Sequence, residues 1–257
     1  MVWGFGQAKA KLVELYSPPG VTRHLQMPCA VKQGILPGAT YDLVRDAAGR
    51  SWDFTDPKQR QKARSEIAAM KPYMVVGSAP CTQFCRWQRV NHPRMDPKLV
   101  NRELVAARAH VGFCVQVYRD QLARGAHYLH EHPESASSWH LLDVKQLAED
   151  PRSIRVTMDM CQYGMTQRDA NGNACPIYKP TSWLTSAAEV AKELTKRCPD
   201  RKGHGHVTLR GGRCKAAPVY SPRVCRAIVR GIPRQSGKGI EEPLPSTYWI
   251  AWTLVMQ

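Results

Sequence analysis

Residues 73–81 read YMVVGSAPC, a short apolar run that stops at Gly77 and continues into a loop with a cysteine at its end. An apolar run of this length, bounded by turn residues, predicts a buried β-strand. Helix-like segments precede and follow it, at residues 53–72 and 98–124. Strands that alternate with helices are typical of a mostly parallel sheet, in which ligands bind outside the carboxyl ends of the strands. Cys81 therefore lies where such a sheet would carry a site.

The rest of the chain extends this pattern. The fold class that follows is α/β: a Rossmann-like, mostly parallel sheet with helices on both faces, and a small C-terminal subdomain that contains cysteine and histidine. Further strands are expected within residues 10–20, 39–46, 127–133 and 154–164, with a helix over 137–150.

Composition changes beyond about Asn171, where glycine, proline, cysteine, histidine and basic residues dominate. We therefore predict one catalytic-type domain over residues 1–170 and a small basic subdomain over 171–234. Residues 235–257 are interpreted as a linker and C-terminal tail, because their composition is typical of flexible segments.

The chain is strongly basic. Its 257 residues include 37 Lys and Arg against 21 Asp and Glu, a formal charge of +16. Such a surplus attracts polyanions, so nucleic acid is the leading partner class. Charge alone does not separate DNA from RNA or from an anionic membrane surface, and it leaves the oligomeric state open.

Nine cysteines without regular spacing do not indicate a disulfide framework. We expect an intracellular, reducing compartment, either nucleus or cytoplasm. The N-terminus has no continuous apolar core of signal-peptide length, and no stretch approaches the length of a membrane span, so no membrane association is expected.

Cys81 alone allows two interpretations. A loop at a strand end beside a helix N-terminus lowers the pKa of a thiol and makes it a nucleophile. The alternative is a buried structural thiol, because cysteine is among the commonest interior residues.

The order of four motifs favours the nucleophile, because it resembles the cytosine carbon-5 methyltransferase family, which uses S-adenosylmethionine. SAPCTQF, around Cys81, is similar to the family's Pro-Cys-Gln nucleophile loop. LHEHP places Glu131 on the glutamate of the family's Glu-Asn-Val motif, although His132 and Pro133 differ from it. QYGMTQRD is similar to the Tyr-Gly-Val-Pro-Gln-Arg-Arg motif, and VELYSPPGVTRHL occupies the place of the cofactor loop.

The resemblance implies a role for each matching residue. The catalytic residues would be Cys81, Glu131 and Arg168. Substrate would contact Thr82 and Gln167. S-adenosylmethionine would contact Leu15, Tyr16, Ser17, Gly20, Asp42, Asp53 and Pro80.

The implied chemistry explains why these residue types must converge. The cysteine adds to carbon 6 of cytosine, which turns the ring into an enamine that can attack the methyl donor through carbon 5. A carboxyl group at ring nitrogen 3, assigned to Glu131, stabilises the adduct, and Arg168 can hold the base or a phosphate. The target base must leave a duplex or already be single-stranded. DNA is the favoured substrate, and RNA is the alternative.

A second site is expected in the C-terminal region, where CPDRKGHGHVTLRGGRC carries two cysteines and two histidines. Thiolate and imidazole are ligands that zinc prefers, although this spacing matches no standard finger. The predicted zinc ligands are Cys198, His204, His206 and Cys214.

Two other functions remain open from the sequence. The late Gly-Asn motif of the family is absent, and only one glycine of its cofactor loop, Gly20, has a counterpart. These departures favour a catalytically silent nucleic-acid-binding module. A thiol-dependent enzyme acting on a small substrate would need a base beside Cys81, for which the sequence offers His92 and His130.

Overall fold

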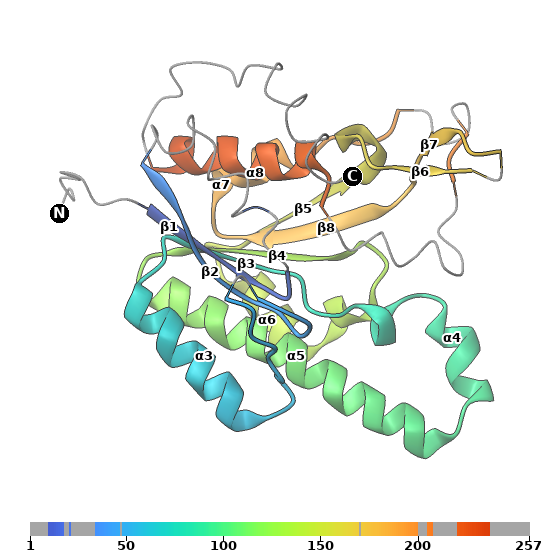
Figure 1. Ribbon diagram of the computed structural model, residues 1–257, viewed down its shortest axis with the longest axis horizontal. Coiled ribbons are helices and arrows are strands. Elements are labelled where there is room, and N and C mark those ends of the chain that lie inside the picture. The colour runs from blue at the N-terminus through green and yellow to red at the C-terminus, as the bar shows by residue number, and fades with distance from the viewer. Residues whose placement is uncertain are drawn as a thin grey trace.

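The computed structural model describes residues 10–17, 21, 34–46, 48–169, 171–199, 205–207 and 220–236. Its main feature is a six-stranded sheet in the order β2-β1-β3-β4-β8-β5 (Figure 1). The pairings from β2 to β4 are parallel, and β8 runs antiparallel to both of its neighbours. The strands are β1 (Ala10–Leu15), β2 (Ile35–Tyr41), β3 (Met74–Gly77), β4 (His127–Pro133), β8 (Pro180–Thr185) and β5 (Ile154–Asp159).

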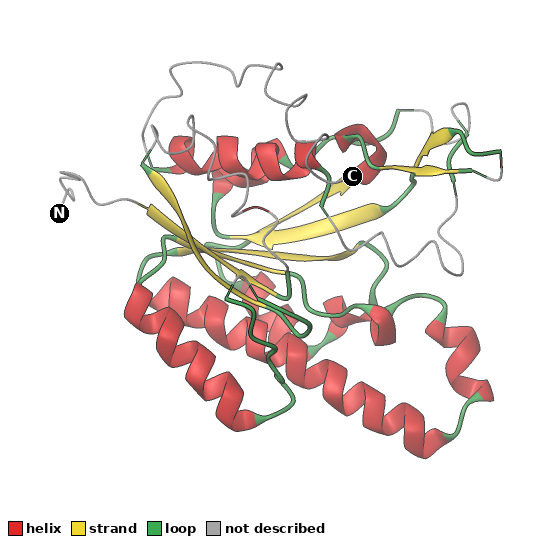
Figure 2. Ribbon diagram, viewed as in Figure 1, coloured by secondary structure: helices red, strands yellow, loops and turns green. Residues whose placement is uncertain are grey.

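Helices cover both faces of this sheet (Figures 1 and 2). On one face lie α3 (Pro57–Met70), α5 (Pro97–Ala123) and α6 (Leu142–Glu149), and on the other lie α7 (Ala188–Glu193) and α8 (Pro222–Gln235). The expected α/β class with a mostly parallel sheet is therefore confirmed.

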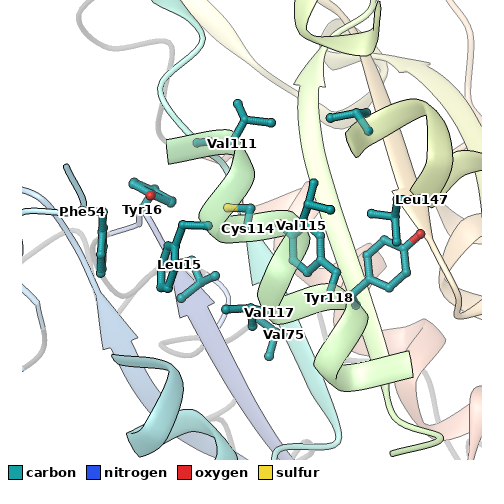
Figure 3. Close-up of a cluster of buried hydrophobic side chains, with 14 of the residues drawn as sticks. Leu15, Tyr16, Phe54, Val75, Val111, Cys114, Val115, Val117, Tyr118 and Leu147 are labelled. Atoms are coloured by element: carbon teal, nitrogen blue, oxygen red, sulfur yellow. The ribbon is translucent and has the colours of Figure 1, made fainter. Parts of the chain in front are cut away.

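Each face of the sheet has its own apolar core, because successive side chains of a strand point to opposite faces. Val75 packs with Val115 and other residues of α5, in the cluster drawn in Figure 3. Its neighbour Val76 belongs to the second cluster, with Trp183 of β8 and Ile228 of α8. Strand β3 is thus buried on both faces, which explains its continuous apolar sequence.

The two long helices begin and end as the sequence predicts. Asp56 and Asp96 are the N-caps of α3 and α5, and each side chain accepts a hydrogen bond from the backbone N–H two residues on. Gly125, with φ of 70°, follows the C-terminus of α5.

Strand β2 lies earlier in the chain than expected. It ends at Tyr41, and the predicted residues beyond it form a turn in which the Asp46 carboxylate accepts hydrogen bonds from the N–H groups of Ala48 and Arg50. Gly38 obscured the strand in the sequence, yet it is required there because a Cβ would lie 2.6 Å from the carbonyl oxygen of Leu12.

Strand β8 was not predicted, and it changes the expected organisation. It comes from the region assigned to a separate subdomain, but it lies between β4 and β5 in the main sheet. The boundary expected at residue 170 therefore does not coincide with an end of the sheet. The strand was hidden because buried polar residues interrupt it. Their hydroxyls are satisfied internally, as in the bond between Thr157 Oγ1 and Ser182 Oγ at 2.9 Å.

Short elements complete the described chain. They include a two-stranded hairpin, and among the described residues no helix combines the length and apolar character needed to cross a bilayer. The short elements are η1 (Thr82–Phe84), α4 (Gln88–Asn91), η2 (His92–Arg94), η3 (Ser137–His140), η4 (Met160–Tyr163), β6 (Thr166–Arg168) and β7 (Ala174–Pro176).

Candidate active site

Cys81, Glu131 and Lys179 meet at one edge of the sheet. Cys81 follows the carboxyl end of β3, and Glu131 lies in the last half of β4, which pairs in parallel with β3. Because β8 is antiparallel to β4, its first residues lie at the same edge, and Lys179 immediately precedes it. Three segments far apart in sequence therefore bring a thiol, a carboxylate and an ammonium group together.

Glu131 is a buried carboxylate whose contacts leave one oxygen incompletely satisfied. The residue is 6% exposed, and its Oε1 lies 3.6 Å from Nζ of Lys179. That oxygen is buried and accepts no hydrogen bond from the described residues. A buried carboxylate oxygen in this state is costly unless a ligand supplies a donor. The arrangement fits a ligand with an N–H group, such as a pyrimidine ring edge.

The half-buried Cys81 thiol is electrostatically linked to both groups. The pKa of Cys81 is raised to about 11, first by burial and then by the Glu131 charge, while Lys179 acts in the opposite direction. The sequence predicted a lowered pKa for Cys81, so that expectation is wrong for this state of the protein. Desolvation by the packed loop outweighs the effect of the strand-end position.

The loop that carries Cys81 is held from both faces of the sheet. On the α5 side, buried His132 lies with Nε2 2.8 Å from the Ala79 carbonyl oxygen and Nδ1 2.5 Å from Oγ of Ser138. Burial lowers the pKa of His132, which keeps the ring neutral, so Nε2 must donate to the carbonyl and Nδ1 accept from the hydroxyl. On the α8 side, Ser78 and Tyr220 are hydrogen-bonded through their hydroxyls.

The backbone of Cys81 begins the turn that follows β3. Cys81 is the N-cap of η1, with φ of −94° and ψ of −2°, and its carbonyl oxygen accepts a hydrogen bond from the Phe84 N–H at 3.0 Å. Thr82, exposed beside it, begins η1. Its carbonyl oxygen accepts a hydrogen bond from the Gln88 side chain at 3.1 Å.

The hydrogen bond that Arg168 makes does not connect it to Cys81, Glu131 or Lys179. It is exposed in β6, and its guanidinium donates to the Gly172 carbonyl oxygen at 2.7 Å, within its own hairpin. The neighbouring Gln167 is half-buried, and its Oε1 has no hydrogen-bond partner among the described residues. The cation beside Glu131 is instead Lys179, which sequence reasoning missed. Recognising β8 as a strand beside β4 would have identified it.

The predicted cofactor residues cluster at the neighbouring strand ends. Leu15 pairs with Tyr41 at the ends of β1 and β2, so Tyr16 and Asp42 emerge side by side. The Trp52 N–H donates to the Asp42 carbonyl oxygen at 3.0 Å, which brings the next residue, Asp53, to the same edge.

These residues differ in how far their own polar groups are engaged. Asp42 is half-buried and accepts one long bond, 3.3 Å from the Arg45 N–H. The exposed Asp53 carboxylate accepts from the N–H and hydroxyl of Thr55 at 2.8 and 2.6 Å. Tyr16 is buried, with its hydroxyl 3.2 Å from Nδ1 of His110.

Three further residues were predicted to contact the cofactor, namely Ser17, Gly20 and Pro80. Ser17 and Pro80 are half-buried, and Gly20 lies outside the described residues. Glu14, which the sequence did not single out, is fully buried and accepts a hydrogen bond from the Val21 N–H at 3.0 Å. It thereby ties the chain that follows β1 back to the strand.

A basic pocket of about 460 Å³ opens beside the Cys81 loop. It lies between the η1–η2 segment, the first half of α5 and the η3 region. Cationic or titratable residues supply much of its lining, namely Arg86, Arg89, His92, Arg108 and His140. Such a lining is suited to an anionic group.

Neither histidine offered for a thiol-dependent enzyme is engaged with Cys81. His92 Nε2 lies 3.1 Å from the Gln83 side-chain oxygen. His130 points to the α5 side, where its Nδ1 lies 3.2 Å from the Tyr118 hydroxyl. The groups that act on the pKa of Cys81 are Glu131, Lys179 and Cys85. This arrangement disfavours a cysteine-histidine nucleophile.

The predicted metal ligands are brought together in part. Sγ of Cys198 lies 3.7 Å from Nε2 of His206, and Cys161 joins them. His204 and Cys214 lie outside the described residues.

No protein-family model matches the sequence, and a search of curated proteins finds no significant match.

Proposed function

We propose that the protein transfers a methyl group from S-adenosylmethionine to carbon 5 of cytosine in nucleic acid, through a covalent bond between Cys81 and carbon 6. One observation carries the proposal: a thiol and a buried carboxylate with an unsatisfied oxygen share the carboxyl edge of a parallel sheet. The motif resemblance supports the same two residues. The Rossmann-like identity of the sheet belongs to this proposal.

In this mechanism Glu131 binds and protonates the base. Its unsatisfied oxygen takes up the ring edge of cytosine, and a proton on the carboxyl group is shared with ring nitrogen 3. Cys81 supplies that proton when its sulfur attacks carbon 6, so the new sulfur–carbon bond forms as the ring becomes an enamine. After methyl transfer the proton on carbon 5 passes to water, the electron pair of that bond expels the Cys81 sulfur from carbon 6, and ring nitrogen 3 returns its proton to Glu131.

The raised pKa of Cys81 makes this step dependent on substrate. In the free protein the Glu131 carboxylate disfavours a second negative charge on the thiol. As the Cys81 proton passes to Glu131 and ring nitrogen 3 of the bound base, that repulsion falls and Lys179 stabilises the thiolate. Cys81 is then activated by the bound base and remains unreactive without it.

Leu15, Tyr16 and Asp42 would hold S-adenosylmethionine, with Ser17, Asp53 and Pro80 around it. The half-buried Asp42 carboxylate, engaged by one long hydrogen bond, fits a ligand with ribose hydroxyls. When bound, the sulfonium would supply an electrophilic methyl group.

Nucleic acid is the substrate class that the charge supports. The chain carries a formal charge of +16, and Arg86, Arg89 and Arg108 line the pocket beside Cys81. Trp87, in the same segment, is 57% exposed and offers a surface on which a base can stack. DNA is favoured over RNA here on the family resemblance alone.

A second candidate is a catalytically silent nucleic-acid-binding module. The raised pKa of Cys81 favours it, because a thiol with a pKa of about 11 is not a nucleophile at neutral pH unless its surroundings change.

Isothermal titration with S-adenosylmethionine, followed by transfer of labelled methyl groups to cytosine-containing DNA and RNA, distinguishes the two. Binding and incorporation of label at carbon 5 support the enzyme. Failure to bind the methyl donor, even with nucleic acid present, contradicts it and supports the silent module.

A further inference from the structure

Cys161, Cys198 and His206 form a compact cluster of metal-ligating groups. Their ligand atoms all lie within 4.8 Å of one another. Cys198 is buried, and the other two residues are half-buried. In a tetrahedral zinc site the ligand atoms stand about 3.5–3.8 Å apart, because the metal–ligand distances are about 2.0–2.3 Å. The Cys198–His206 separation of 3.7 Å is already at that value.

The backbone holds these three segments together independently of any ligand. Asp159, at the end of β5, accepts hydrogen bonds on Oδ2 from the Cys198 N–H at 2.8 Å and forms an ion pair with Nε of Arg197 at 3.1 Å. Cys161 follows Asp159 in η4. The Val207 N–H donates to the Pro176 carbonyl oxygen at 2.9 Å, which fixes the chain beside His206.

The polar surroundings fit a cation. Asp159 is fully buried, and its Oδ1 has no hydrogen-bond partner among the described residues. The Gln162 side chain donates to Sγ of Cys161 at 3.8 Å, the kind of contact that supports a metal-bound thiolate. Asp159 thus adds a buried carboxylate close enough to act on the pKa of Cys161, and its ion-pair partner in the described contacts is the Arg197 guanidinium.

We propose that the protein binds one zinc ion through Cys161, Cys198 and His206. Two thiolates and one imidazole are a donor set that selects zinc over calcium or magnesium. Binding releases the two thiol protons to solvent and changes no oxidation state. The metal joins the end of β5 to the segments at residues 196–198 and 205–207.

The proposed site also borders the candidate active site. The Met160 N–H donates to the Lys179 carbonyl oxygen at 3.2 Å, so the turn that carries Cys161 also holds the residue paired with Glu131. The zinc proposal does not depend on the methyltransferase proposal, since each rests on different side chains.

Metal analysis of the full chain, purified without chelators, tests the proposal. About one equivalent of zinc is expected in the wild type. Cys161→Ser and His206→Ala should lose most of it, with circular dichroism showing that each variant is folded. Cys175→Ser is the matched control, because Cys175 is half-buried nearby but donates to Asp169 Oδ2 at 3.6 Å and is outside the cluster.

Cobalt titration of the wild-type chain keeps the test decisive if a variant fails to fold. Tetrahedral cobalt bound by two thiolates gives strong sulfur-to-cobalt absorption that zinc abolishes. If zinc-free wild-type protein titrated with cobalt shows no such absorption, the proposal is overturned. Cys161→Ser protein that retains its full metal content would overturn it as well.

Discussion

Nζ of Lys179 lies 3.6 Å from Oε1 of Glu131, and both side chains are largely buried. An ion pair in this position sets the charge that the neighbouring Cys81 thiol experiences. The carboxylate raises the pKa of Cys81, and the ammonium group lowers it. Glu131 lies in β4 and Lys179 immediately precedes β8, so the pairing depends on β8 lying antiparallel beside β4.

Removing the Glu131 charge should lower the pKa of Cys81, and removing the Lys179 charge should raise it. In the wild type the pKa is raised to about 11, mainly by burial. Glu131→Gln removes a negative neighbour, so thiolate should form at lower pH, and Lys179→Met should delay it to higher pH. The rate of Cys81 alkylation by iodoacetamide against pH, followed by peptide mapping, measures this. Alkylation curves that coincide in all three proteins would contradict the electrostatic link.

Asp42→Asn should weaken S-adenosylmethionine binding. The substitution keeps the shape of the side chain but removes the charge at the end of β2, where ribose hydroxyls would bind. Asp53→Ala should weaken binding less, because the Asp53 carboxylate is already engaged by Thr55. Calorimetric titration of both variants measures the effect, and unchanged affinity in Asp42→Asn would remove this residue from the cofactor site.

Nucleic acid binding should weaken steeply as salt rises, and the basic pocket should contribute to that dependence. Arg86→Gln and Arg89→Gln should each reduce the slope of log affinity against log salt by about 1 if each arginine contacts one phosphate. Arg152→Gln is the control, because Arg152 is paired with Asp150 at 2.7 Å and does not line the pocket. Equal slopes in all four proteins would exclude the pocket as a phosphate site.

Gly231 allows α8 to approach α7. A Cβ at Gly231 would lie 2.5 Å from the backbone Cα of Val190, so Gly231→Ala should destabilise the fold by about 1–3 kcal/mol through overpacking. Gly112→Ala in α5 is the matched control, since nothing lies within 4 Å of its Cβ position. There alanine should stabilise the helix by about 0.5–1 kcal/mol. Urea unfolding measures both changes, and equal stabilities would show that the helices can separate.

Local sequence patterns predicted much of the framework. The apolar run of β3, the Asp56-Pro57 start of α3 and the glycine that follows α5 identified these elements because each signal lies within a few residues. Placing Cys81 and Glu131 at strand ends follows from the same patterns, since parallel neighbours end at one edge.

The features that the sequence did not predict depend on contacts between segments far apart in the chain. Lys179 is near Glu131 only because β8 inserts beside β4, and buried hydroxyls such as that of Ser182 gave this strand a loop-like sequence. Cys161 lies near Cys198 because the Asp159 carboxylate, at the end of β5, accepts a hydrogen bond from the Cys198 N–H. The pKa of Cys81 likewise depends on how tightly the loop is buried, which motif spacing does not encode.

Covalent capture of the base tests the central claim most directly. When carbon 5 carries fluorine in place of hydrogen, there is no proton to remove from it after methyl transfer. The sulfur–carbon bond of the proposed intermediate then cannot break. Wild-type protein incubated with S-adenosylmethionine and fluorocytosine-containing DNA or RNA should give a denaturant-resistant adduct that maps to Cys81. It should be retained in Cys85→Ser and lost in Cys81→Ser. Methylation of normal substrate by Cys81→Ser at the wild-type rate, or an adduct at another cysteine, would contradict the account.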